Sequence, residues 1–122
     1  MSNWSPDELA QLNRAGEIRV AGRRLDGSLR TLVTIWHVVV DGALYARSAR
    51  GADGQWYRGV SRHHEGAITW NDGQPRAAAF IPDPAQDAAI DAAYVAKYGN
   101  GSATTVITRP AARATTLRIE PR

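Results

Sequence analysis

The segment from Leu44 to Arg58 holds the residues of this chain best suited to binding a ligand. It runs from a predicted strand into a glycine-containing loop that carries arginines, the hydroxyl of Ser48 and the pair Trp56-Tyr57. Guanidinium groups and loop amides can bind a phosphate, a serine hydroxyl adds a donor, and an aromatic ring can lie against a planar group. The segment therefore fits a phosphorylated, planar ligand. An ordinary hairpin with solvated arginines and aromatic residues in the core would show the same pattern.

Within this segment, Ser48 and the amide of Gly51 are expected to hold the anion, with Arg50 or Arg58 supplying the opposite charge. Arg47 and Ser48 are neighbours on the predicted strand and would point to opposite faces of a regular strand. If both contact one ligand, one of them must do so from the end of the strand.

Trp36 and His37 are the remaining candidates, as residues that contact a substrate. They lie in a run of β-branched and apolar residues, 31–40, which predicts a central strand buried on both sides. His37 has the chemistry to exchange a proton, and Trp36 could form a platform for a ring. The alternative places Trp36 in the core and gives His37 an ordinary hydrogen bond.

Other chemically suggestive residues give no distinct site. His63 and His64 are adjacent, so their side chains diverge, and no third ligand has the spacing of a metal site, so none is expected. Three carboxylates recur at every fourth position of a predicted helix: Asp83, Asp87 and Asp91. Asp83 is expected to cap the helix, and the other two to favour its positive N-terminal end or to face solvent.

Length and composition narrow the class of protein. The 122 residues predict one domain, 1–122, and the absence of cysteine excludes disulfides and is compatible with a reducing compartment. No stretch has the ~18 apolar residues of a membrane span, and the N-terminal residues lack the pattern of a signal peptide. We therefore expect a soluble, cytoplasmic protein with no membrane partner.

The basic residues are almost all arginine: 14 arginines and one lysine, Lys97, with a formal net charge of +3. The arginine fork suits phosphate and carboxylate ligands. The arginines are spread along the chain and alternate with acidic residues, so nucleic acid is not the expected partner. Arg58 and Arg62 would share a helix face, which favours a nearby anion, although two solvated arginines would fit as well.

Turn and cap signals divide the chain into short elements. Ser5-Pro6 begins a helix that Gly16 ends, Asp41-Gly42 forms a tight hairpin turn, and Asn71-Asp72-Gly73 forms another. Helices are expected near 5–16 and 83–98, with a short helix or turn at 55–63. Strands are expected at 17–22, 31–40, 43–49, 67–70, 74–81, 104–108 and 115–119. Such hairpins predict an antiparallel sheet, closed as a small barrel with helices outside.

Short motifs along nearly the whole chain carry a resemblance to a known family. These are Asp26-Gly27 with Arg30, Ile35-Trp36 with Val38, residues 44–48, Gly54 with Trp56-Tyr57-Arg58, Ile90-Asp91, Lys97-Tyr98-Gly99 and residues 115–118. They resemble a small bacterial family of split β-barrel, flavin-binding-like proteins, which is related to pyridoxamine-phosphate oxidases and deazaflavin-dependent nitroreductases.

The resemblance implies a mainly β (α+β) fold, a six-stranded antiparallel split β-barrel with flanking helices. It also implies a homodimer that binds FMN or a deazaflavin and acts as an oxidoreductase on a small organic molecule. In the nitroreductase relatives, a serine-ending strand, a glycine loop and a Trp-Tyr helix start hold the cofactor phosphate. Ser48, Gly51, Trp56 and Tyr57 stand at the corresponding positions. The alternative is a split-barrel protein that binds another ligand without any cofactor.

Overall fold

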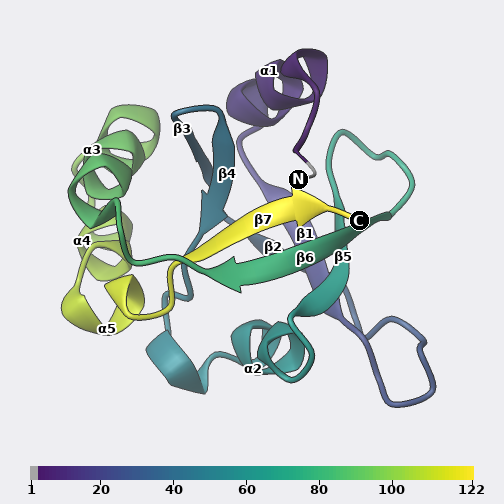
Figure 1. Ribbon diagram of the computed structural model, residues 1–122. Coiled ribbons are helices and arrows are strands. Elements are labelled where there is room, and N and C mark those ends of the chain that lie inside the picture. Colours follow the sequence, from purple (N-terminus) through teal and green to yellow (C-terminus); the bar gives the residue numbers. More distant parts are fainter. Residues whose placement is uncertain (1–2) are drawn as a thin grey trace.

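The computed structural model describes residues 3–122 as a curved sheet surrounded by short helices (Figure 1). The helices are α1 (Pro6–Arg14), η1 (Gly51–Asp53, a 3-10 turn), α2 (Gln55–Ser61), α3 (Asp87–Tyr98), α4 (Ser102–Ile107) and α5 (Pro110–Arg113). The strands are β1 (Ile18–Gly22), β2 (Val33–Ile35), β3 (Val38–Val40), β4 (Ala43–Ala46), β5 (Glu65–Thr69), β6 (Arg76–Pro82) and β7 (Leu117–Pro121). No helix of this part of the chain is long and apolar enough to cross a membrane.

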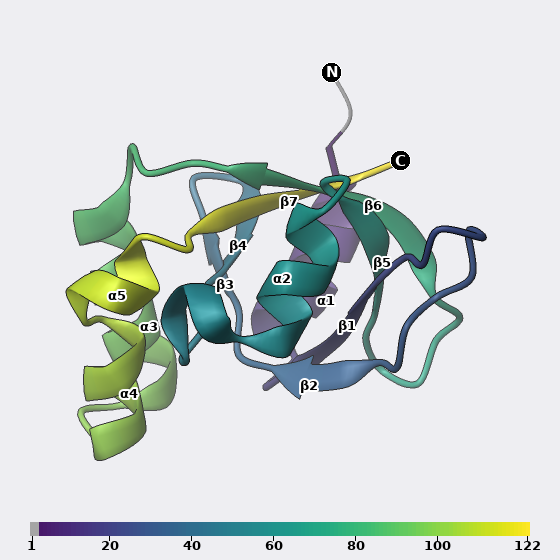
Figure 2. The same cartoon turned by 90° about the horizontal axis from the view of Figure 1, so that it is seen from below.

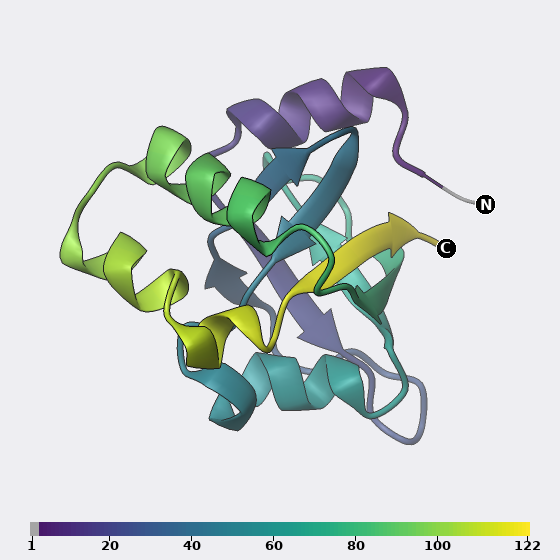
Figure 3. The ribbon, with the colours of Figure 1, turned by 60° about the vertical axis from the view of Figure 1, so that its left-hand side comes forward.

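The seven strands form one antiparallel sheet in the order β2-β1-β5-β6-β7-β4-β3. The sheet bends into a half-barrel, and its two edge strands, β2 and β3, are not paired with each other. α1 and α2 lie at opposite ends of this half-barrel, and α3, α4 and α5 gather on one flank (Figures 1 and 3). Seen from below, α2 lies across the sheet, where it packs against β1 and β5 (Figure 2). This arrangement gives one sheet of seven strands, whereas the resemblance implied a six-stranded barrel.

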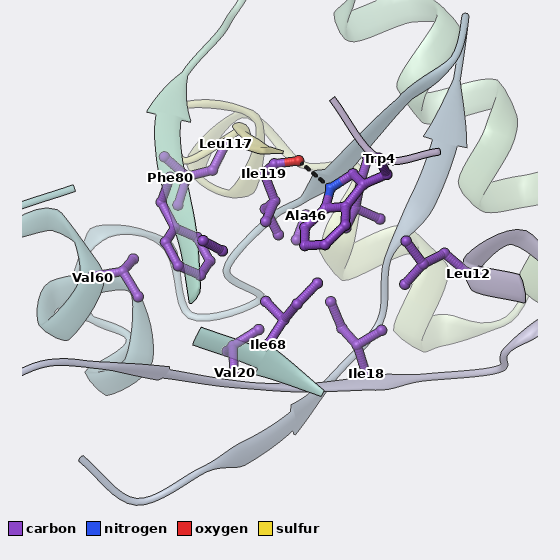
Figure 4. Close-up of a cluster of buried hydrophobic side chains, with 12 residues drawn as sticks. Trp4, Leu12, Ile18, Val20, Ala46, Val60, Ile68, Phe80, Leu117 and Ile119 are labelled. Carbon is purple, nitrogen blue, oxygen red and sulfur yellow. Dashed lines mark hydrogen bonds between the residues drawn. The ribbon is translucent and has the colours of Figure 1, made fainter. Parts of the chain in front are cut away.

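The main core fills the concave side of the half-barrel (Figure 4). Its side chains come from α1, α2 and the inner strands, and the indole nitrogen of Trp4 donates to the carbonyl of Ile119 at 2.8 Å. A smaller cluster joins the outer face of β3 and β4 to α3 and α4 through Val38, Tyr45, Tyr94 and other residues. Burial of both clusters holds the helices against the sheet.

Several local predictions are confirmed. Ser5 caps α1 in a capping box with Glu8, because each side chain bonds the backbone amide of the other residue. Asp41 and Gly42 both have positive φ in the turn that joins β3 to β4. The predicted second hairpin joins β5 to β6, and its turn residues Asn71 and Asp72 also have positive φ.

The predicted central strand at 31–40 is wrong. The chain forms β2 and β3 there, interrupted at Trp36 and His37, and these strands lie at opposite edges of the sheet. Val33 and Thr34 are exposed, so the run is not buried on both faces. The β-branched residues correctly indicated an extended backbone. The segment forms two strands because β2 pairs with β1 and β3 pairs with β4.

The predicted strand at 104–108 is also wrong, because these residues belong to α4. Thr104 and Ile107 are buried three residues apart, and the Thr108 hydroxyl donates back to the Thr104 carbonyl at 2.9 Å. Packing of α4 against α3, with Ile107 in the smaller core cluster, thus overrides the strand preference of threonine and isoleucine. The alanine-rich connection that follows forms α5, and the last strand begins at Leu117 instead of Thr115.

Close packing of α2 on β1 depends on two glycines. A Cβ added at Gly22 would lie 2.5 Å from the carbonyl group of Gly59, which is too close for any side chain. The short helix predicted at 55–63 is confirmed as α2. The glycines let this helix pack directly against the sheet. This contact fixes the position of the residues that line both cavities described below.

Candidate functional site

A cavity of about 570 Å³ opens between β2, the segment after β4, the start of α2 and α4. We call it the ligand cavity. Its lining is mostly apolar and comprises Glu17, Val33, Thr34, Ile35, Trp36, Arg47, Ser48, Ala49, Arg50, Gly54, Gln55, Trp56, Ala103 and Ile107. Five of the nine residues predicted to bind cofactor or substrate are therefore brought together: Trp36, Arg47, Ser48, Arg50 and Trp56.

Trp36 forms an aromatic wall of the ligand cavity. Its ring stacks on Tyr98 with centroids 4.0 Å apart and planes 8° from parallel. Tyr98 is held in turn, because its hydroxyl lies 2.8 Å from the Gly16 carbonyl and accepts from the His37 amide at 3.2 Å. Trp36 is half-buried, so it is not the fully enclosed core residue of the alternative interpretation.

Ser48 places an unused hydroxyl in the wall of the ligand cavity. The residue is 1 % exposed, and its Oγ has no hydrogen-bond partner among the described residues. A Cβ at Gly54 would lie 2.2 Å from this oxygen, so only glycine at position 54 leaves it room. A buried hydroxyl without a partner is costly, and a ligand acceptor would remove that cost.

Arg47 lines the ligand cavity but is fully engaged in holding helices. Its side chain is completely buried and forms ion pairs with Asp91 and, at 3.1 Å, with Asp87. Its Nε donates to Thr116 at 2.9 Å, and its other nitrogens also reach the carbonyl of Ile107 at 3.2 Å. The guanidinium therefore joins β4 to α3 and α4. Its predicted contact with a phosphate finds no free donor in this arrangement.

The helix carboxylates thus have partners that the sequence did not reveal. Although burial raises the pKa of Asp91, hydrogen bonds from Arg113 and Arg47 hold that pKa below its usual value. Asp83 lies outside α3 and pairs with Arg118 at 2.6 Å. Asp87 lies in the first turn of α3, as predicted, whereas Asp83 does not cap α3 and Asp91 pairs with Arg47 and Arg113 instead of facing solvent.

Arg50 is the exposed cation of the ligand cavity. It follows Ser48 by two residues, lines the cavity, and takes part in no ion pair within residues 3–122. The amide of Gly51 is already used, because it donates to the Ser48 carbonyl at 3.0 Å with Gly51 at a φ of +65°. Of the predicted phosphate-binding groups, Ser48 and Arg50 remain available.

His37 lies outside the ligand cavity and is buried against α1. Its Nε2 is 2.6 Å from the Leu12 carbonyl, and the Lys97 amine is 3.1 Å from the same nitrogen. The pKa of His37 is lowered to about 4, mainly by burial. The hydrogen bond to Leu12 opposes this shift in part, and the charge of Lys97 adds to it. Burial likewise lowers the pKa of Lys97 to about 8. The predicted substrate contact of His37 is therefore not supported by its position.

Tyr57 and Arg58 also lie outside the ligand cavity. Tyr57 packs on the main core with its ring edge against Trp56, the centroids being 6.2 Å apart. Arg58 lines a second cavity on the other side of Trp56, together with three further arginines. The sequence signalled this second group only through the spacing of Arg58 and Arg62, and gave no sign of its remaining members. Among residues 3–122, no three potential metal ligands come together.

Similar folds occur in solved structures of low sequence identity. A structure named "F420 Reductase" has a TM-score of 0.57 at 20% identity, over 93% of this chain and 91% of that one. HutZ, the heme storage protein from Vibrio cholerae, has a TM-score of 0.63 at 9% identity, over 98% and 91%. A putative 5-nitroimidazole antibiotic resistance protein from Bacteroides thetaiotaomicron has a TM-score of 0.58 at 17% identity, over 99% and 81%. At these identities the likeness concerns the fold alone.

The family assignment rests on the sequence itself. No curated protein shows significant sequence similarity to this chain. The family model described as "Uncharacterized protein conserved in bacteria (DUF2255)" matches residues 8–119, which is nearly the whole chain. The matched range includes every residue that lines the ligand cavity. The protein therefore belongs to the DUF2255 family of bacterial proteins.

Proposed function

We propose that this protein binds a flavin-type cofactor, FMN or a deazaflavin, in the ligand cavity and uses it for redox chemistry on a small organic molecule. One observation carries the proposal. A single cavity combines the unpartnered hydroxyl of Ser48 and the exposed guanidinium of Arg50 with the rings of Trp36 and Trp56. The fold shared with a protein named F420 reductase and with a nitroimidazole resistance protein agrees with this assignment.

The residues fit a phosphorylated, planar group. A phosphate near Ser48 would accept from its hydroxyl, which has no partner among the described residues, and would meet the charge of Arg50. The indole rings offer flat apolar surfaces, and Val33 and Ile35 add aliphatic ones. The volume of about 570 Å³ lies within the range of small-molecule sites, roughly 300–1,000 Å³.

The chain contributes binding, orientation and shelter from water. A bound flavin or deazaflavin supplies hydride or electron transfer itself. The stacked pair of Trp36 and Tyr98 fixes one wall, because the Tyr98 hydroxyl is hydrogen-bonded to backbone on two sides. Arg47 acts as a positioning residue, since its ion pairs anchor the backbone that carries Ser48.

Heme is a less suitable ligand for this cavity, although HutZ shares the fold. Heme iron is held in proteins by histidine, cysteine, methionine or tyrosine side chains. None of the residues that line the ligand cavity is of these types. The donor set therefore favours an organic ring anchored by its phosphate over an iron porphyrin.

Titration of the purified protein with FMN and with riboflavin tests the proposal. FMN should bind more tightly than riboflavin, because only FMN carries the phosphate. Arg50→Ala removes a charge-assisted contact worth about 1.5–3 kcal/mol, so it should weaken FMN binding by roughly ten- to a hundred-fold. Arg50→Ala should leave riboflavin binding nearly unchanged, and Arg14→Ala, on the exposed face of α1, is the matched control.

A deazaflavin is titrated in parallel. Absence of binding by FMN, riboflavin and the deazaflavin would overturn the proposal, as would equal affinities for FMN and riboflavin that Arg50→Ala leaves unchanged. The protein would then be better described as a split-barrel protein that binds another small ligand without a cofactor.

We also propose that the protein acts as a homodimer. β2 is an edge strand of the sheet, and Val33 on this strand is 37% exposed where it borders the ligand cavity. A second copy seated against this edge would bury Val33 and complete the open side of the cavity. The oligomeric state in solution, measured by sedimentation velocity, tests this arrangement.

A further inference from the structure

A second cavity, of about 390 Å³, adjoins the ligand cavity and shares Val33, Gln55 and Trp56 with it. Its lining contains four arginines and no acidic residue: Arg24, Arg30, Arg58 and Arg62. We call it the arginine cavity. We propose that it binds an oligoanion, meaning two or more adjacent phosphate or carboxylate groups, as the tail of the ligand whose ring lies in the ligand cavity. The link to a ring-bearing ligand rests on the proposed function, whereas the oligoanion site does not.

No acidic side chain of the described residues forms an ion pair in the arginine cavity. Asp26, whose pKa is lowered mainly by hydrogen bonds from Ser28, is also attracted by Arg24. Arg58 lies in α2, and Arg62 is the residue directly after the last residue of this helix. The two arginines are four positions apart, a spacing at which like charges destabilise a helix. Arg24 is held at the hairpin by bonds to the Leu29 carbonyl at 2.6 Å and to the Ser28 hydroxyl. An anionic ligand would relieve this repulsion.

Arg30 gives the second, independent observation. Its Nε is buried and has no acceptor among the described residues. Its side chain passes over Gly59, where an added Cβ would lie 3.2 Å from Arg30 Cδ, so the glycine makes room for it. A buried, charged donor without an acceptor carries a high cost, which a ligand oxygen at this position would remove.

The number of arginines indicates the kind of anion. A phosphate monoester carries about two negative charges at neutral pH and cannot neutralise four guanidinium groups by itself. Two or more adjacent anionic groups would match both the charge and the forked donors. Because both cavities are lined by Val33, Gln55 and Trp56, an anion in the arginine cavity would lie close to a ring bound beside Trp56.

Calorimetric titration with inorganic tripolyphosphate and with orthophosphate tests the oligoanion site. Tripolyphosphate should bind at least tenfold more tightly than orthophosphate. The double variant Arg58→Ala/Arg62→Ala alters two exposed side chains and should weaken tripolyphosphate binding by roughly a hundred-fold, about tenfold for each lost contact. Arg14→Ala is the control and should bind as the native protein does. Equal affinities for the two anions, or an unchanged affinity in the double variant, would overturn the proposal.

Titration with FAD and with FMN then identifies the source of the anion. FAD carries a pyrophosphate, so FAD should bind more tightly than FMN if the arginine cavity holds the tail of the ligand. This preference for FAD should be lost in Arg58→Ala/Arg62→Ala. If FAD binds no more tightly than FMN, and tripolyphosphate binds equally well with FMN already bound, the arginine cavity does not hold the tail of the flavin. It is then a site for a separate oligoanion. Tripolyphosphate binding without any flavin binding would contradict the proposed function alone.

Discussion

Arg47→Ala is expected to destabilise the protein without acting through the ligand. The native side chain is fully buried, pairs with Asp87 and Asp91, and donates to Thr116 and to the backbone of α4. Removing it breaks the connection between β4 and the flank formed by α3 and α4. It also leaves two carboxylates without their shared cation.

The magnitude follows from burial. Loss of one partner of a buried ion pair costs about 3–5 kcal/mol. The side chains of Asp87 and Asp91 are 33% and 17% exposed, and Asp91 keeps its pair with Arg113, so water and Arg113 compensate in part. We therefore expect a loss of about 3 kcal/mol, against a total stability of roughly 5–15 kcal/mol for a domain of this kind.

Urea denaturation followed by circular dichroism measures this loss directly. Arg113→Ala is the matched control, because it removes an arginine from the same carboxylate, Asp91, at a side chain that is 44% exposed. That control should cost less than about 1 kcal/mol. If Arg47→Ala also costs less than about 1 kcal/mol with an unchanged denaturant slope, and instead abolishes FMN binding, then Arg47 binds the ligand and does not hold α3 and α4 against β4.

Three further predictions follow from the same geometry. Trp36→Ala should lower the free energy of unfolding in urea by only about 1–2 kcal/mol, because the ring is half-buried and stacked on Tyr98. The substitution should also weaken flavin binding, and a loss of about 3 kcal/mol or more would place Trp36 in the core. His37 has a pKa lowered to about 4 in the folded protein, so its contribution is complete above the unfolded value of 6.5 and is lost as the pH falls toward 4. His37→Gln should therefore flatten the fall in stability between pH 6.5 and 5 measured by urea denaturation, and an unchanged slope would contradict a buried neutral imidazole. Sedimentation velocity at micromolar concentration should show a dimer, and a single monomeric species would refute the shared cavity edge.

The elements that the sequence determined are those fixed by neighbouring residues. The capping box of Ser5, the turn at Asp41-Gly42 and the hairpin turn after β5 depend on side chains and φ angles within a few positions. The candidate site could be predicted in part for the same reason. Ser48, Arg50 and Trp56 lie within nine residues of each other, and a strand followed by a glycine loop brings such residues to one corner.

Only the tertiary structure decided which distant residues lie beside the segment from Ser48 to Trp56. Residues 31–40 became two strands at opposite sheet edges because each half pairs with a different partner. That choice left Trp36 between the two strands, where it lines the cavity and stacks on Tyr98. Arg47 received its partners from α3, 40 and 44 residues later in the chain. Arg30 joined Arg58 because Gly22 and Gly59 let α2 approach β1. Contacts between distant segments have no local signal, since they arise only when burial of the whole core selects one arrangement of the elements.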